Sequence, residues 1–206
     1  MNIDFIFEIQ RLKTLAETGL LYSTNEYDKE RYTELHEMSL RWMSYLTNNP
    51  LEQLKELLPI SKDYPTAKVD LRGLLLSEDK KILLVKESLD NKWALPGGWA
   101  DVGFSPKEGI TKEFKEETGL DVIPERLLAV FDKKMHPHPT QAFYVYKLAF
   151  YCTATSFTIS KGFDVLDVQY FDIDNLPELS EDRILKSQIE LLYQKVMSLD
   201  FEPYVD

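Results

Sequence analysis

Residues 97–120, GGWADVGFSPKEGITKEFKEETGL, contain the most informative pattern of the chain. The segment opens with a loop that holds three glycines and continues into a predicted helix over residues 106–118. Ser105 and Glu108 have the spacing of a capping box, and Gly119 follows the last helical residue as a stop signal. The pattern therefore predicts a glycine-rich loop that leads directly into a helix of about three turns.

Three glutamates lie on one side of that helix, because Glu113, Glu116 and Glu117 occupy positions i, i+3 and i+4. Three acids on one face repel one another, and the neighbouring Lys112 and Lys115 offset this only in part. A hard cation such as Mg²⁺ or Mn²⁺ takes carboxylate oxygens as ligands and would remove the repulsion. An isolated acidic triplet is usually a solvated helix face, but its place between a glycine loop and a terminating glycine favours a metal site.

The segment resembles the Nudix box, a glycine followed after five residues by a glutamate and, seven residues later, by Arg-Glu-aliphatic-x-Glu-Glu-x-Gly-aliphatic. The matching residues are Gly98, Glu113, Glu116, Glu117, Gly119 and Leu120, with Phe114 as an apolar stand-in for the first aliphatic. Phe104 departs from the pattern at the first glutamate, and Lys112 departs from it at the arginine. These two positions normally form an ion pair in the family, so Glu108 is a candidate replacement partner for Lys112.

The resemblance to the Nudix family continues outside the box, in residues 81–88, 93–103 and 171–180. The leader around residues 30–43 is similar to the N-terminal domain of a bacterial branch associated with ADP-ribose and CDP-choline pyrophosphatase activity. The resemblance implies an α/β (α+β) fold, a Nudix α/β/α sandwich with a mixed β-sheet, preceded by a small helical N-terminal domain. It also implies a homodimer.

The chain changes from a helical to an alternating, strand-rich pattern near residues 58–67. We therefore predict a helical domain over residues 1–65, with three helices, and a Nudix hydrolase domain over residues 66–206. A last helix is expected at residues 181–199. The expected strands are residues 69–77, 81–88, 93–96, 127–134, 143–154 and 168–173.

By the resemblance, the three box glutamates and the backbone carbonyl of Gly97 are ligands of Mg²⁺ or Mn²⁺. The enzymes of this family hydrolyse the diphosphate of a nucleoside diphosphate linked to another group, X. The expected substrates are CDP-choline, giving CMP and phosphocholine, or ADP-ribose, giving AMP and ribose 5-phosphate. The general base is either a box glutamate, Glu113, Glu116 or Glu117, or an acid of a later loop, Asp164 or Asp167.

Four further residues are candidates for contacts with the substrate. Arg72 and Lys86, on adjacent predicted strands, would approach the diphosphate as cations. Trp99, inside the box loop, would stack on the nucleobase, and His136 would line the pocket from the loop after residues 127–134. The alternative for each is an ordinary solvated or packing residue, and a His-x-His pair without a third soft ligand is weak evidence for a metal.

Composition excludes several other classes of protein. The chain has 206 residues and a formal net charge of −11, and it contains neither a basic block nor an apolar run long enough to span a bilayer. We expect no signal peptide, and the single cysteine fits a reducing, cytoplasmic compartment. Two alternatives stay open: a Nudix-like nucleotide sensor without turnover, suggested by Phe104, and a hydrolase of RNA ends.

Overall fold

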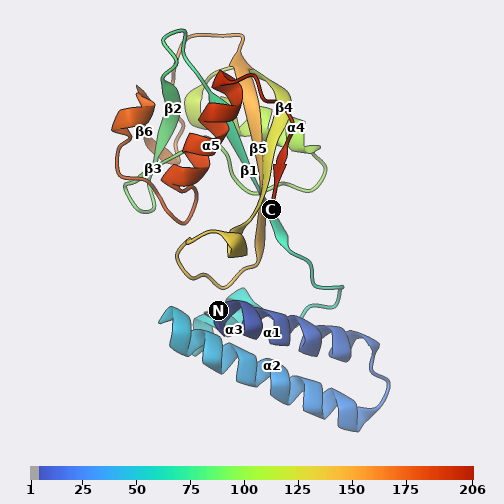
Figure 1. The fold of residues 1–206 in the computed structure, drawn as a ribbon. Coiled ribbons are helices and arrows are strands. Elements are labelled where there is room, and N and C mark those ends of the chain that lie inside the picture. Colours follow the sequence, from blue (N-terminus) through green and yellow to red (C-terminus); the bar gives the residue numbers. More distant parts are fainter. Residues whose placement is uncertain (1–4) are drawn as a thin grey trace. The chain divides into compact units, whose positions relative to one another are not determined.

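The computed structural model describes residues 5–206, which form two compact units (Figure 1). One unit extends to Ala67 and also includes the short segment Thr140–Tyr144. The other comprises Lys68–Pro139 and Val145–Asp206. No helix of the described residues is long and apolar enough to cross a membrane.

The first unit consists of three helices, α1 (Phe5–Tyr22), α2 (Glu26–Thr47) and α3 (Leu51–Leu57). Asn25 caps α2, because its side chain accepts a hydrogen bond from the backbone of the second following residue. Pro50 is the N-cap residue of α3 and directly precedes the first helical turn. The small apolar core of the unit contains Ile6, Ile9, Leu40, Met43, Leu54 and Leu58.

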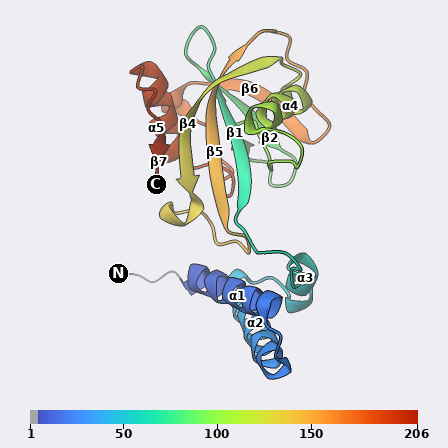
Figure 2. The same cartoon turned by 90° about the vertical axis from the view of Figure 1, so that its right-hand side faces the viewer.

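The second unit contains a four-stranded mixed sheet with the order β1-β5-β4-β7 (Figure 2). Its strands are β1 (Lys68–Leu75), β4 (Val122–Asp132), β5 (Val145–Ala154) and β7 (Tyr204–Val205). β1 runs parallel to β5, β4 runs antiparallel to β5, and β7 runs parallel to β4. A short 3-10 helix, η1 (Lys133–Met135), follows β4.

A second, antiparallel sheet has the order β3-β2-β6 and consists of β2 (Ile82–Glu87), β3 (Trp93–Ala94) and β6 (Val165–Phe171). A 3-10 helix, η2 (Ile173–Asn175), follows it. Because β1 and β2 belong to different sheets, the predicted neighbouring placement of Arg72 and Lys86 is wrong. A turn makes consecutive strands neighbours in a sheet only when the strands pair. Among the described residues, the connection near this turn is an isolated bridge between Leu76, which follows β1, and Ile82 of β2.

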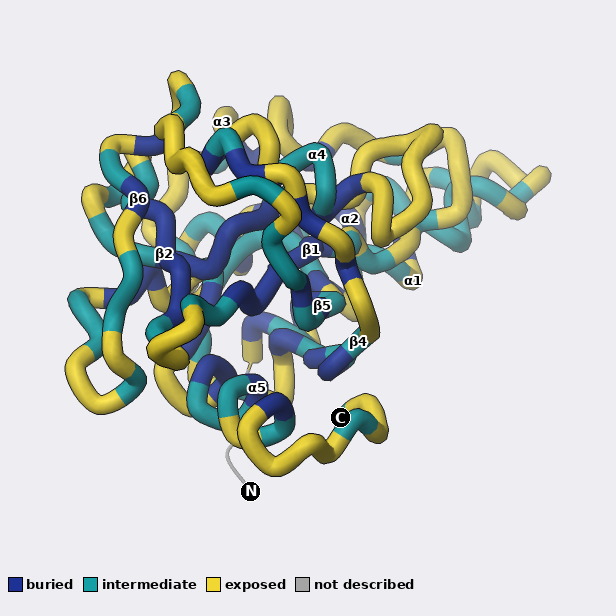
Figure 3. Tube along the Cα trace, turned by 90° about the horizontal axis from the view of Figure 1, so that it is seen from above, coloured by how far each residue is buried: buried dark blue, intermediate teal, exposed yellow. Residues whose placement is uncertain are grey.

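Helices α4 (Pro106–Thr118) and α5 (Lys186–Met197) cover opposite faces of the strands. Successive side chains of a strand point to opposite faces. Accordingly Leu71 and Leu75 of β1 pack in the same core as Phe114 of α4, whereas Leu74 packs in the same core as Leu192 of α5. β1 and β2 therefore run through the buried interior (Figure 3), and the predicted α/β/α sandwich is confirmed.

The largest differences from the predicted boundaries are at the start of the last helix and at the start of β4. The last helix begins at Lys186 instead of residue 181, because residues 180–184 form a separate turn closed by a hydrogen bond from the Ile184 N–H to the Ser180 carbonyl. β4 begins at Val122 instead of residue 127, since pairing with β5 extends the strand through Pro124.

Candidate active site

The glycine loop of residues 97–103 is attached to β1 by backbone hydrogen bonds. The Leu71 N–H donates to the Gly98 carbonyl at 2.7 Å, and the Gly73 N–H donates to the Pro96 carbonyl at 2.9 Å. Gly97 has a φ of +140°, and a Cβ there would lie 2.0 Å from the Leu71 carbonyl oxygen. The position accepts only glycine, for both conformational and steric reasons.

Two box glutamates of α4 meet this loop. The Gly97 N–H donates to Oε2 of Glu117 at 2.9 Å, and the Glu117 residue is 4% exposed. A Cβ on Gly98 would lie 2.9 Å from Oε1 of Glu113, so that carboxylate also rests against the loop. The capping turn at Ser105 joins the glycine loop to α4. The carboxylates of Glu113 and Glu117 therefore both lie against this loop.

Burial determines the electrostatics of these acids. Burial raises the pKa of the Glu117 carboxyl to about 8, although the Arg72 guanidinium acts in the opposite direction. Burial also raises the pKa of Glu113. With a pKa of about 8, the Glu117 carboxyl holds its proton near neutral pH unless a cation takes the place of that proton.

Glu116, the third box glutamate, is exposed and forms an ion pair with Lys112 at 3.2 Å. Lys112 is also paired with Asp101 at 3.1 Å, and its Nζ lies 5.9 Å from the centroid of the Phe104 ring. Asp101 and the ring of Phe104 therefore hold the cation that a glutamate at position 104 would hold in the usual box.

The expected pairing of Glu108 with Lys112 is wrong. The Glu108 carboxylate accepts a hydrogen bond from the Ser105 N–H at 2.8 Å and completes the capping box. A glutamate at the third helical position is used for the helix terminus, and Asp101, which lies outside the helix, takes Lys112 instead.

The described residues contain no group of three His, Cys, Asp or Glu side chains arranged to hold a metal ion as they stand. Each box carboxylate has its own contact: Glu117 with the Gly97 amide, Glu113 with Gly98, and Glu116 with Lys112. The donor set nevertheless fits a hard dication, because it supplies carboxylate oxygens and includes a buried acid whose proton a cation could replace.

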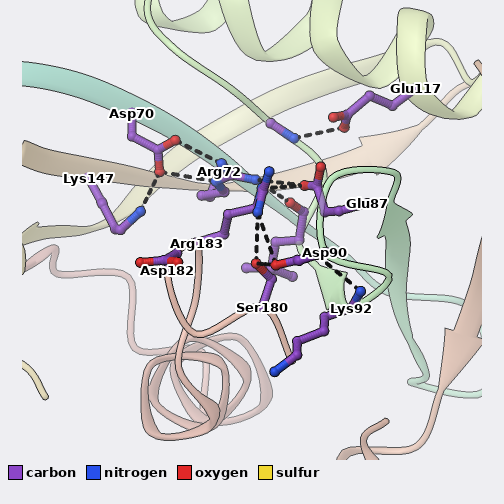
Figure 4. Close-up of polar contacts among 12 residues, drawn as sticks. Asp70, Arg72, Glu87, Asp90, Lys92, Glu117, Lys147, Ser180, Asp182 and Arg183 are labelled. Atoms are coloured by element: carbon purple, nitrogen blue, oxygen red, sulfur yellow. Dashed lines mark hydrogen bonds and ion pairs between the residues drawn. The ribbon is translucent and has the colours of Figure 1, made fainter. Parts of the chain in front are cut away.

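Arg72, predicted to bind the diphosphate, is 4% exposed and tightly held. Its Nε and Nη2 donate to Asp70 at 3.0 and 2.8 Å, and its Nη1 donates to the Leu95 carbonyl at 3.0 Å. Asp70 also accepts from Lys147 at 2.7 Å. Figure 4 shows Arg72 between this pair and Glu117, so the guanidinium lies beside the acids in a fixed orientation.

The ion network continues from Arg72 to residues that the sequence analysis did not identify. Glu87 lies 3.9 Å from Arg72 and 3.0 Å from Nε of Arg183. Arg183 in turn contacts Asp90 at 3.3 Å and the Ser180 hydroxyl at 2.9 Å. These residues come from three separate segments (Figure 4), and no local pattern of spacing could have connected them.

The two later acids occupy different surroundings. The carboxylate of Asp167 accepts hydrogen bonds from the Val168 N–H and the Gln169 side chain, and Asp167 lies opposite Lys86 in the β2–β6 register. Asp164 is exposed, and its charge contributes to the raised pKa of Glu87. The charge of Asp164 therefore acts on Glu87, whereas the carboxylate oxygens of Asp167 are engaged by neighbouring residues of β6.

Trp99 and His136, the other two residues predicted to contact the substrate, have the following contacts. Trp99 is 47% exposed, and the Lys68 ammonium lies 5.2 Å from its ring centroid. Nε2 of His136 lies 2.8 Å from the Asp206 carboxylate, and its ring packs edge-on against Phe131. His136 thereby connects η1 to the strand β7.

Comparison with known proteins agrees with this geometry. Residues 68–192 match the family model described as the NUDIX domain, and residues 6–58 match "UDP-X-like, N-terminal oligomerisation domain". A Bacillus subtilis (strain 168) protein named "Putative ADP-ribose pyrophosphatase YjhB" is 40% identical over 184 residues, 89% of this chain and 88% of its own length.

Solved structures give the same result. A UDP-X diphosphatase is 36% identical, with a TM-score of 0.64 and 98% of both chains covered. An ADP-ribose pyrophosphatase of Streptococcus suis 89-1591 is 35% identical, with a TM-score of 0.62, covering 68% of this chain and all of that one. The fold and the glutamate helix define a hydrolase of the Nudix type. The chain belongs to the Nudix hydrolase family.

The raised pKa of Glu117 predicts how the stability of the metal-free protein depends on pH. A carboxyl group with a raised pKa contributes stability that is present below its unfolded-state value near 4.5 and is lost as the pH rises through about 8. With EDTA present, the free energy of unfolding should fall between pH 5 and pH 8, and Glu117→Gln should flatten this slope. Urea titrations at several pH values measure it, and equal slopes in the two proteins would contradict the assignment.

Proposed function

We propose that the protein is a divalent-metal-dependent pyrophosphatase that hydrolyses a nucleoside diphosphate linked to a second group, X. The observation that carries the proposal is the pair of carboxylates of the half-buried Glu113 and the buried Glu117, held against the glycine loop at Gly98 and Gly97. Mg²⁺ or Mn²⁺ bound there would neutralise the diphosphate and lower the pKa of a bound water.

The residues of the site would have the following roles. Glu113, Glu116, Glu117 and the Gly97 carbonyl would hold the metal, and Glu116 would have to leave Lys112 to do so. Asp164 is the better candidate for the general base among the later acids, because the oxygens of Asp167 already accept two hydrogen bonds. The buried guanidinium of Arg72 would stabilise negative charge beside these carboxylates.

ADP-ribose and sugar-linked UDP derivatives are the proposed substrates. The names of the similar proteins support this choice: two are named for ADP-ribose and one for UDP-X, and two of the three cover most of this chain. CDP-choline, the other substrate implied by the sequence resemblance, is the second candidate. We also propose a cytoplasmic location, because the chain has a single cysteine, Cys152, which is free and buried and fits a reducing compartment.

Chromatography of products from ADP-ribose, UDP-glucose and CDP-choline tests the proposed activity. With Mg²⁺ the wild type should form a nucleoside monophosphate, and Glu116→Gln should reduce kcat at least about 100-fold because a metal ligand is lost. Glu190→Gln, a matched change on the partly exposed face of α5, should leave kcat unchanged. Folded protein that binds these compounds without turnover would identify a sensor and overturn the proposal.

We also propose that the helical unit forms a homodimer. A cavity of about 390 Å³ opens between its first two helices and is lined almost entirely by apolar side chains, namely Phe5, Glu8, Ile9, Leu12, Trp42, Tyr45 and Leu46. Trp42 is 47% and Tyr45 85% exposed. An apolar face of this kind on an oligomerisation-type domain is suited to a second copy of the same chain.

A charged residue at this face should prevent dimer formation. Trp42→Glu should change a dimer into a monomer, because an unpaired carboxylate would have to be buried in an apolar interface. Tyr27→Glu, at the other end of α2 and 71% exposed, is the matched control and should stay dimeric. Sedimentation velocity distinguishes the two states, and a dimer that survives Trp42→Glu would place the interface elsewhere.

A further inference from the structure

Lys112 lies between two carboxylates at the exposed edge of the candidate metal site. Its Nζ donates to Oδ2 of Asp101 at 3.1 Å and lies 3.2 Å from Oε2 of Glu116. The first carboxylate belongs to the glycine loop, and the second lies on α4 one turn after Lys112. In the metal-free protein an ammonium group therefore joins the loop to one of the three glutamates proposed to bind the metal.

The Lys112 ammonium and a metal ion make competing demands on Glu116. A carboxylate oxygen binds Mg²⁺ at about 2.1 Å, and an ammonium paired with the same carboxylate would lie within a few ångströms of the ion and repel it. Glu113 is affected as well: burial raises its pKa, and the charge of Lys112 opposes that rise. Binding of a dication is therefore unfavourable as long as Lys112 stays paired with Glu116.

Phe104 explains why the ammonium of Lys112 pairs with Glu116. The centroid of the Phe104 ring lies 5.9 Å from Nζ of Lys112, so the side chain at position 104 is within reach of the ammonium. A ring attracts an ammonium group through its face but supplies no carboxylate oxygen to it. Among the described residues, the carboxylates that pair with Lys112 are those of Asp101 and Glu116.

We propose that Lys112 is an internal competitor of the metal, which holds Glu116 in the metal-free protein and lowers the affinity of the site for a divalent cation. The metal must displace the ammonium from Glu116, and Asp101 is placed to keep the ammonium after it has left. Lys112 is thus a positioning residue that acts through Glu116. The inference rests on the proposed function, because it takes Glu116 to be a metal ligand.

Calorimetric titration with Mn²⁺ tests this competition, and its readout is metal affinity instead of turnover. Lys112→Met should tighten Mn²⁺ binding about threefold, a change of the size expected for loss of a largely exposed ion pair. Lys115→Met is the matched control, because Lys115 lies on the same helix and is paired with Asp121. This control should bind Mn²⁺ like the wild type. Unchanged or weaker binding in Lys112→Met would overturn the inference.

A double-mutant cycle separates displacement of Lys112 from a general effect of charge. Phe104→Glu should also tighten Mn²⁺ binding about threefold, because a carboxylate at position 104 would draw the ammonium away from Glu116. In the Lys112→Met background, Phe104→Glu should have no larger effect than Val102→Glu, which adds the same charge at a fully exposed position of the same loop. Equal effects of Phe104→Glu in the two backgrounds would overturn the inference.

The same titrations distinguish failure of the inference from failure of the proposed function. Wild-type protein that binds Mn²⁺ with an affinity indifferent to Lys112→Met and Phe104→Glu would refute the inference alone. The expected pattern of affinities in a protein that hydrolyses none of the nucleotide substrates would refute the proposed reaction alone. Folded wild-type protein that does not bind Mn²⁺ would overturn both. The replaced side chains are at least partly exposed, so the variants should keep the unfolding midpoint of the wild type.

Discussion

The hydrogen bond from the Gly97 N–H to the Glu117 carboxylate, 2.9 Å long, connects the two segments on which the site depends. One partner belongs to a loop pressed so closely against Leu71 of β1 that only glycine fits. The other belongs to α4, which is anchored to the same strand by the buried ring of Phe114, 0% exposed. The position of the carboxylate is therefore fixed by packing on both sides, independently of any ligand.

The hydrogen bond to Gly97 holds the Glu117 carboxylate in the interior, where an ionised group is less stable than in water. Glu117 is balanced in part by Arg72, and Arg72 is oriented by Asp70. Glu87 extends the ion network from Arg72 to Arg183. A protein maintains such a network at some cost in stability, and the proposed binding of a cation on one side and an anionic diphosphate on the other gives a reason for that cost.

The sequence predicted those features that depend on local spacing. The helix over residues 106–118 and its capping box follow from residues three and four positions apart, and both are present. The three glutamates that were expected on one face have separate contacts, with Gly97, Gly98 and Lys112. The division of the strands between two sheets could not be predicted, because β1 pairs with β5, about 75 residues away in sequence. The replacement of the usual box ion pair by Asp101 and Phe104 likewise depends on how the loop folds back.

The sequence likewise predicted only part of the candidate site. The glutamates and Gly97 were identified from the box, whereas Asp70, Glu87, Lys133, Lys147 and Arg183 were missed. Each of the missed residues looks like an ordinary charged residue in its own segment. Three of them, Asp70, Lys133 and Lys147, are buried, which only the tertiary structure reveals. For Asp70 and Lys147, a charged residue within a strand's apolar run was the available signal.

In the proposed metal site, the buried acid Glu117 exchanges its proton for a metal ion. Calorimetric titration with Mn²⁺ at pH 7, repeated in buffers of different ionisation enthalpy, counts the protons released per metal bound. The structure predicts release of a sizeable fraction of one proton from the wild type, together with much weaker binding and little release in Glu117→Gln. Equal affinity in the two proteins, with no proton released from the wild type, would contradict the claim.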